Sequence, residues 1–417
     1  MKELKVLYRG FGAEIELGTL ADDGNDVLFQ YSAEAITQDL QLSPIRLPLR
    51  AAAYPDQQTQ YLSMQRVPGL LGDSLPDSWG FHLMNRRLRA RGIAPETLST
   101  LDRLAYLGNS TMGALGYQPA AESLNDNKDL TLVELASEMH ALMVDQSHVV
   151  LDEIARAGGS PGGARPKALV YFNPKTGQMS TQAAHVQDAE AWLVKFPASD
   201  DEADSCALEA LYALVAAECD MGMTPARFFE LPSGLTAFAT RRFDREGQQR
   251  VHVHSLAGML HADFQIPSLG YEDYFKATRR LTRDERELKK AVQRCVFNVL
   301  MNNRDDHARN MAFLLDRDKA WRLAPPYDLT YCPGYKGEHF MDVMGEGRAP
   351  GRSHIVQAAG AAGLHEKDTA DIIDRMLDQA SNIALRTLAG GLPIRARRLK
   401  EVVHAIEENR RRLSAGG

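Results

Sequence analysis

Residues 298–331 read NVLMNNRDDHARNMAFLLDRDKAWRLAPPYDLTY, and this stretch guides the interpretation of the whole chain. It contains Asp305, then Asn310 five positions later, and a second aspartate, Asp328. The preceding segment 284–303 carries apolar residues at helical spacing, which predicts a buried helix that ends at Asn302–Asn303. The sequences MAFLL and AWRL flank the turn DRDK, so a short β-hairpin is predicted to bring Asp328 back towards Asn310.

These three polar residues are the groups that phosphoryl transfer from ATP requires. A carboxylate must orient and deprotonate the attacking hydroxyl, while an amide oxygen and a second carboxylate hold Mg²⁺ against the phosphates. The spacing from Asp305 to Asn310 equals that of the kinase catalytic loop H-R-D-L-x-x-x-N, and Asp306 lacks it. The alternative is a plain polar loop between a helix and a strand. The complete set, with Asp328 after a Pro-Pro-Tyr sequence, favours a phosphoryl-transfer site.

A candidate nucleotide-binding lysine lies upstream of this stretch. Lys195 falls in the predicted strand AWLVKFP (191–197), and the predicted helix 203–221 that follows carries Glu209. An ATP kinase needs a lysine on the α- and β-phosphates that is held by a helical glutamate. A lysine on the exposed face of an edge strand is the competing interpretation, and this pair alone does not decide between the two.

The segment RAGGSPGGARPKALV (156–170) is rich in glycine and precedes the strand that begins at Lys167. Glycines let backbone N–H groups approach phosphate oxygens, and a lysine adds a point charge. The segment matches neither the Walker A pattern nor the kinase G-x-G-x-x-G, so a flexible loop is the alternative. Ser160 within it would be an accessible phosphoacceptor. The glycines of this segment are Gly158, Gly159, Gly162 and Gly163.

The composition is that of an ordinary globular protein. Forty-eight basic and 55 acidic side chains give a net charge of −7, which argues against binding nucleic acid across a broad surface. The four cysteines form no C-x-x-C pair, so a zinc site is not expected. No signal peptide or membrane helix is recognisable, and a cytoplasmic location is expected. His252 and His254 alternate on a predicted strand, where we expect strand-surface or hinge residues and no metal.

The order of predicted elements indicates an α+β chain of several domains. A small N-terminal α+β domain is predicted over residues 1–125. Residues 126–245 read as a strand-rich kinase N-lobe with the glycine-rich loop, and residues 246–417 as a mainly helical C-lobe with the catalytic loop. The chain is therefore expected to place a bilobal protein-kinase-like fold after its small first domain.

Several segments together resemble the HipA-type serine/threonine kinases, the toxins of bacterial type II toxin–antitoxin systems. The most specific are SPGGARPKALV, WLVKFP, ALEALYALVAAE, ATRRFDR, NNRDDHARN and PPYDL. DSLPDSWG and GNSTMGALGY are similar to the small N-terminal domain of that family. The resemblance covers nearly the whole chain.

This resemblance implies a role for each matching residue. Asp305 would be the catalytic base, Asn310 and Asp328 the Mg²⁺ ligands, and Lys195 the ATP-phosphate lysine with Glu209 as its helical neighbour. The loop residues Gly162, Gly163 and Lys167 would contact the nucleotide, and Arg242 with Phe243 would form the hinge that meets adenine mainly through backbone groups. Arg241 occupies a position that is often acidic in the family. Ser160 falls where the family carries an inhibitory autophosphorylation site.

The resemblance also implies partners. These are a helix-turn-helix antitoxin, through which DNA is reached indirectly, and a protein substrate such as an aminoacyl-tRNA synthetase. The function expected is an ATP- and Mg²⁺-dependent protein kinase that arrests growth. A small-molecule kinase of similar fold remains an alternative, because nothing in the residues encodes the acceptor. A non-catalytic corepressor that binds an antitoxin is a second alternative.

Overall fold

The structure is a computed structural model that describes residues 2–23, 26–55, 66–120, 130–144, 165–198, 201–380 and 382–415. The chain forms two compact units. Unit 1 comprises residues 1–203, 227–254 and 258–261. Unit 2 comprises residues 204–226, 255–257 and 262–417.

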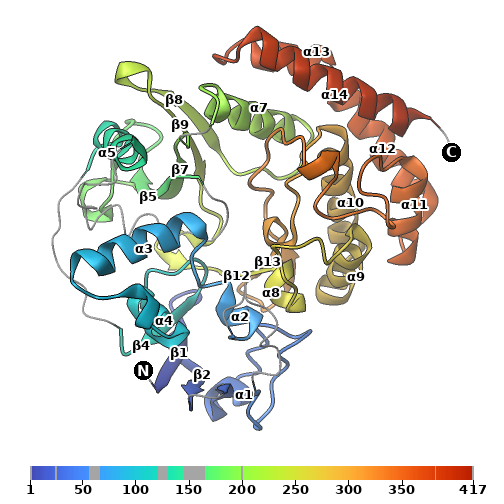
Figure 1. Cartoon of the computed structure of the whole chain (residues 1–417). Coiled ribbons are helices and arrows are strands. Elements are labelled where there is room, and N and C mark those ends of the chain that lie inside the picture. Colours follow the sequence, from blue (N-terminus) through green and yellow to red (C-terminus); the bar gives the residue numbers. More distant parts are fainter. Residues whose placement is uncertain are drawn as a thin grey trace. The chain divides into compact units, whose positions relative to one another are not determined.

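Unit 1 begins with a four-stranded antiparallel sheet of order β3-β2-β1-β4 (Figure 1). Alternation of polar and apolar residues produces it: in β1, Leu4 and Val6 are buried and Lys5 between them is exposed. The elements are β1 (Glu3–Tyr8), β2 (Ile15–Asp22), β3 (Val27–Tyr31), β4 (Leu115–Gln118), α1 (Ala33–Thr37), α2 (Gly69–Gly72), α3 (Ser78–Ala90), η2 (Pro95–Thr97) and α4 (Thr100–Leu107).

A second sheet of unit 1 has five strands in the order β6-β5-β7-β9-β8. Trp79 and Leu83 of α3, with Met139 of α5, pack against Val170 and Trp192 of this sheet. Burial of each large apolar side chain contributes roughly 1.5–3 kcal/mol. The elements are α5 (Leu132–Val144), β5 (Lys167–Phe172), β6 (Met179–Ser180), η3 (Ala183–His185), β7 (Glu190–Lys195), β8 (Ala226–Glu230), η4 (Pro232–Gly234), β9 (Thr236–Arg241), β10 (Arg245–Glu246) and β11 (Gln249–Arg250).

Unit 2 is mainly helical and is built around α10, which packs against α9, α12 and α14 (Figure 1). The predicted helical spacing is confirmed, because Leu288, Val292 and Cys295 are all buried. The elements of this unit are α7 (Ser205–Glu218), α9 (Tyr271–Thr282), α10 (Glu285–Leu300), η5 (Ala308–Asn310), β13 (Ala312–Leu315), β14 (Trp321–Leu323), η6 (Tyr335–Gly337), α11 (Arg352–Ala361), α12 (Glu366–Gln379), α13 (Asn382–Ala389) and α14 (Ala396–Ser414). Two further elements, β12 (His252–Ser255) and α8 (Leu256–Leu260), contain residues of both units.

The bounds of the two compact units differ from the bounds of the three predicted domains. The boundary predicted at residue 125 lies outside the described residues, and the boundary at 245 falls inside a segment of unit 1. Helix α7, which carries Glu209, belongs to unit 2 and not with the strands of the predicted N-lobe. The three-domain division stays a prediction.

The expectation that His252 and His254 lie on a strand surface is wrong. Both side chains are buried. Nε2 of His252 lies 3.1 Å from the carbonyl oxygen of Leu42, and the ring of His254 bridges Asp73 at 2.6 Å and Ser43 at 3.0 Å. Leu42 and Ser43 lie 210 and 211 positions from their histidine partners, and Asp73 lies 181 positions from His254. The alternating pattern on β12 therefore could not indicate which distant residues cover it.

Buried histidines should make the stability of the protein depend on pH. Burial, together with nearby His254, lowers the pKa of His252 to about 3, and burial chiefly lowers the pKa of His261 to about 4. Both rings are therefore neutral in the folded protein, whereas the unfolded chain takes up protons near pH 6.5. The free energy of unfolding should fall between about pH 6.5 and 5, by roughly 1–2 kcal/mol for each histidine.

Urea unfolding across this pH range measures the effect. His252→Gln should reduce the dependence of the free energy of unfolding on pH. His404→Ala, which removes an exposed ring on α14, should leave it unchanged. Equal pH dependence in the wild type and in His252→Gln would contradict the assignment.

Candidate functional site

The end of α10 delivers the candidate catalytic loop. Nearly every residue in the second half of this helix is buried, and Met301 caps its C-terminus. Asn302 then adopts a left-handed backbone conformation with φ of 54°, which asparagine tolerates better than most residues. Its side-chain amide donates to the carbonyl oxygen of Cys332 at 3.1 Å, so the turn that starts the loop is fixed.

Asp305 lies on the surface of this loop. Its side chain is 57% exposed, and Nε2 of His307 lies 4.0 Å from its Oδ1. An exposed carboxylate can be reached by the hydroxyl group of an acceptor, and a general base must come within hydrogen-bonding distance of the proton it takes. The position of Asp305 therefore suits the role predicted for it.

Asn310 is held by the same loop. Its Nδ2 donates to the backbone carbonyl oxygen of Asp305 at 2.9 Å. Its Oδ1 is buried and accepts no hydrogen bond within the described residues. A buried amide oxygen without a donor is costly unless another group binds it. A Mg²⁺ ion bound to this oxygen would supply that missing partner.

The β13–β14 hairpin returns the chain to this place, as predicted. Phe313 pairs with Leu323 in antiparallel register. Beyond the hairpin the hydroxyl group of Tyr327 donates to the carbonyl oxygen of Arg309 at 2.5 Å. The residues joined by this hydrogen bond are the immediate predecessors of Asp328 and Asn310, so the two predicted metal ligands belong to loops that are tied together.

The backbone of Asp328 is unusual. Its φ of 57° lies in the left-handed region, which is sparsely populated by residues other than glycine and is enriched at functional sites. One carboxylate and one amide oxygen suit Mg²⁺, which usually binds one or two protein carboxylates and completes its shell with water and phosphate oxygens. Within the described ranges, no three His, Cys, Asp or Glu side chains gather into a metal-binding group.

Asp306 has a different environment from its neighbour. It is fully buried, and its Oδ2 accepts from the hydroxyl group of Tyr271 at 2.7 Å and lies 2.8 Å from Nδ1 of His339. Its Oδ1 accepts from the backbone N–H of Phe340 at 2.8 Å. Burial and the adjacent Asp306 raise the pKa of Tyr271, so this phenol stays protonated and donates. Asp306, which lacks the five-residue spacing to Asn310, thus holds neighbouring segments together through its buried carboxylate.

The predicted ATP-phosphate lysine and its glutamate lie in different units. Lys195 ends β7 in unit 1, with its side chain buried, and it stands opposite Lys167 in the β5–β7 register. Glu209 is buried in α7 of unit 2. Buried ionised side chains require partners. The pairing of Lys195 with Glu209 stays a prediction.

Lys167 has a partner that the sequence did not reveal. Its buried ammonium group lies 2.5 Å from Oδ2 of Asp77, while Oδ1 of the same carboxylate caps α3 by accepting from the N–H of Gly80 at 2.7 Å. The carboxylate of Asp77 thus caps the N-terminus of α3 and also neutralises the charge of Lys167. The N-cap position of Asp77 in DSLPDSWG was a usable local signal, but its pairing with a residue 90 positions away was not.

The predicted adenine hinge is organised around an ion pair. Arg242 binds Asp244 through two hydrogen bonds of 2.8 and 2.7 Å, and its backbone N–H donates to the carbonyl oxygen of Ala191. Phe243 between them is partly exposed, and Arg241 reaches Glu190 at 3.4 Å. The guanidinium of Arg242 is therefore engaged within the protein, and the contact of the hinge with adenine stays a prediction.

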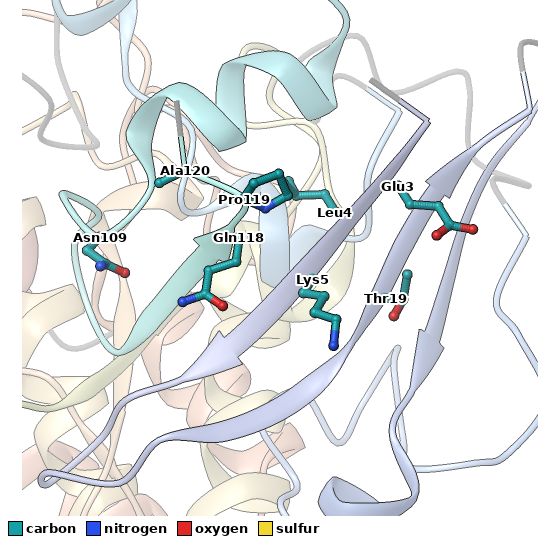
Figure 2. Close-up of a pocket in the computed structure, with 8 residues that line it drawn as sticks. All are labelled: Glu3, Leu4, Lys5, Thr19, Asn109, Gln118, Pro119 and Ala120. Atoms are coloured by element: carbon teal, nitrogen blue, oxygen red, sulfur yellow. The ribbon is translucent and has the colours of Figure 1, made fainter. Parts of the chain in front are cut away.

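Three predicted residues of the glycine-rich loop, Ser160, Gly162 and Gly163, lie outside the described residues. A depression of about 570 Å³ in unit 1 contains none of the predicted site residues. Figure 2 shows its lining, where Lys5 and Thr19 stand on neighbouring strands and Gln118 on β4. The two charged residues of this lining, Glu3 and Lys5, are both exposed, and Lys5 is paired with Glu16 at 2.7 Å, so the depression offers no buried charge to a ligand.

Comparison with known structures defines the class of fold. HipA of Shewanella oneidensis MR-1, solved with HipB and its operator DNA, matches with a TM-score of 0.70 and 15% identity, over 98% of this chain and 96% of that chain. The proinflammatory kinase CtkA of Helicobacter pylori matches with a TM-score of 0.44 and 15% identity, over 60% of this chain and 90% of that one. The match to HipA shows that this chain has the α+β, kinase-like fold of that protein, in which a smaller N-terminal domain precedes a larger C-terminal part.

Two family models match the sequence. The model of the HipA N-terminal domain covers residues 11–118, and that of the HipA-like C-terminal domain covers residues 159–384, more than half of the chain. The chain therefore belongs to the HipA family, which confirms the resemblance seen in its motifs. The comparison with curated proteins finds no match. In the part of the chain that the structure describes, no helix combines the length and apolar composition needed to span a bilayer.

Proposed function

We propose that this protein is an ATP- and Mg²⁺-dependent serine/threonine protein kinase that acts as a growth-arresting toxin. The observation that carries the proposal is that one loop presents both an exposed carboxylate, that of Asp305, and a buried side-chain amide oxygen, that of Asn310. Asp305 is accessible, and Asn310, five positions on, presents a buried Oδ1 that receives no hydrogen bond from any residue the structure describes. Membership of the HipA family supports the same reaction class.

Each residue has a defined task in the proposed reaction. The acceptor hydroxyl gives its proton to Asp305 while its oxygen bonds to the γ-phosphorus, and the bond to the β–γ bridging oxygen breaks to release ADP. Asn310 and Asp328 would hold Mg²⁺, which neutralises charge on the phosphates when bound. Lys195 would bind the α- and β-phosphates, with Glu209 as its neighbour, and the hinge at Phe243 would meet adenine.

Autophosphorylation of Ser160 would limit the activity of the enzyme. A phosphate there adds nearly two negative charges to the loop that is proposed to bind ATP phosphates, so repulsion would switch the kinase off. The proposed partners are a helix-turn-helix antitoxin and a cytoplasmic protein substrate, such as an aminoacyl-tRNA synthetase. DNA would be reached only through the antitoxin. The HipA of Shewanella oneidensis MR-1 was solved with HipB and operator DNA, which supports this arrangement by analogy.

Intact-mass measurement of the purified protein tests the proposal. Incubation with ATP and Mg²⁺ should add the mass of one phosphate, and Ser160→Ala or removal of divalent metal by a chelator should prevent this addition. Labelled ATP added to a cell lysate should then leave label on protein. Label confined to small molecules would indicate a small-molecule kinase. No transfer under any condition would indicate a non-catalytic corepressor.

A further inference from the structure

Arg304, which immediately precedes the proposed base, binds the backbone of one segment, residues 333–348. Among the described residues, the hydrogen bonds of its guanidinium all go to backbone carbonyl oxygens of that segment. In return, the backbone carbonyl oxygen of Arg304 accepts from the N–H of Phe340 at 3.2 Å. The accepting carbonyl groups belong to Pro333 at 3.3 Å, Arg348 at 3.3 Å and Gly337.

Asp306, which immediately follows the proposed base, binds the same segment. Its buried carboxylate accepts from the backbone N–H groups of Phe340 at 2.8 Å and Met341 at 3.5 Å, and it contacts the ring of His339. Both neighbours of Asp305 are thus attached to residues 333–348. The position of the base is fixed by the conformation of that segment, because the chain between two anchored residues has little freedom.

The segment is shaped to fit around Arg304. Gly334 and Gly337 both have left-handed backbones, with φ of 72° and 76°. A Cβ atom on Gly334 would lie only 2.9 Å from Cβ of Arg304 and would collide with the carbonyl group of Glu338. Only glycine allows so close an approach in this conformation. The contact between Arg304 and residues 333–348 therefore depends on glycine at position 334.

The ligands of Arg304 are neutral carbonyl groups. In many protein kinases the segment after the metal-binding aspartate becomes ordered when a phosphate on it pairs with arginine. Here backbone carbonyl groups accept from both terminal nitrogens of the Arg304 guanidinium. Tyr335 carries the only hydroxyl group between positions 333 and 348, and its side chain points into solvent with 84% of its surface exposed.

We propose that Arg304 and Asp306 are positioning residues that hold residues 333–348 and Asp305 in the active arrangement without phosphorylation of that segment. This inference rests on the proposed kinase function. It adds that the catalytic loop is preset when the chain folds, and that regulation must act elsewhere in the molecule.

Hydrogen exchange tests the structural part without relying on activity. In Arg304→Ala, amides within residues 333–348 should exchange about tenfold faster or more, because each lost charged hydrogen bond frees part of the segment. Exchange in α10 should not change. Arg280→Ala, which removes an exposed arginine on α9, is the matched control and should behave like the wild type. Unchanged exchange in Arg304→Ala would overturn the inference.

Kinetics test the positioning role. Arg304→Ala should lower kcat by about tenfold or more while the affinity for ATP changes little. Added guanidinium ion should restore part of the rate, whereas Arg304→Lys should rescue poorly because one ammonium group cannot replace a planar fork of donors. Tyr335→Phe should retain full activity, and its loss of activity would show that phosphorylation is required. If the wild type transfers no phosphate, the proposed function fails, while the exchange result still decides whether Arg304 holds the segment.

Discussion

Replacing Asp305 by alanine is expected to lower the rate of phosphate transfer by about 10²–10⁴-fold, the usual contribution of a positioned general base. The fold should survive, because the side chain of Asp305 is largely exposed and substitutions at such positions change stability by less than about 0.5 kcal/mol. Initial rates of phosphate incorporation, with circular dichroism to confirm folding, measure the effect. Growth arrest on expression should be lost in parallel.

The control for this variant is Asp318→Ala, which removes an exposed carboxylate in the turn of the β13–β14 hairpin. It should transfer phosphate at the wild-type rate. Asp328 needs more care, because its left-handed backbone disfavours alanine. Asparagine tolerates that conformation and keeps one oxygen, so Asp328→Asn isolates the loss of charge at the proposed metal. A wild-type rate in Asp305→Ala or in Asp328→Asn would remove that residue from the proposed mechanism.

Replacing Asp244 by alanine is expected to destabilise unit 1 by about 3–5 kcal/mol, the typical cost of leaving a buried charge without its partner. Asp244 is fully buried, and it binds Arg242, Arg245 at 2.7 Å and the backbone N–H of Gly113 at 2.8 Å. Burial alone would raise the pKa of Asp244, but the two arginines outweigh burial and hold it well below its usual range. The carboxylate is therefore charged at neutral pH, and its removal isolates the buried Arg242.

Urea unfolding measures this loss of free energy of unfolding. In Asp244→Ala the urea concentration at the midpoint of unfolding should be lower, while the slope of the free energy of unfolding against urea concentration should be similar to that of the wild type. Glu230→Ala, which removes an exposed carboxylate at the end of β8, is the matched control and should change the midpoint little. A midpoint for Asp244→Ala close to that of the wild type would show that the arginines find other partners. The same variant should also perturb the hinge, because Phe243 lies between the two members of the ion pair.

Local patterns predicted the elements that position the candidate site. The periodicity of residues 284–303 predicted α10, and the two short apolar runs around DRDK predicted the hairpin that returns to Asp328. The spacing that selected Asp305 over Asp306 agrees with their environments, since the first is exposed and the second buried. Such features depend on residues near one another in the chain, which is why sequence could supply them.

The remaining features depend on partners that are distant in the chain. Nothing within the strand around Lys167 indicates Asp77, and the alternation of His252 and His254 indicates a strand without indicating the segment that buries it. Arg304 received no role from sequence, because its ligands are backbone carbonyl groups, which have no side-chain signature. Burial that results from contacts between distant parts of the chain cannot be predicted from the local sequence pattern and becomes visible only in the folded structure.

The hydrogen bond from Tyr327 to Arg309 has a consequence for how chain length can vary in this protein. It closes a loop whose far end is the β13–β14 turn, in which Asp316 accepts from the backbone N–H groups of Asp318 and Ala320. Residues added at this exposed turn would lengthen only its outer end. A single residue added within either strand would instead reverse which side chains face inward. Length variation can therefore accumulate at the turn without moving either proposed metal ligand.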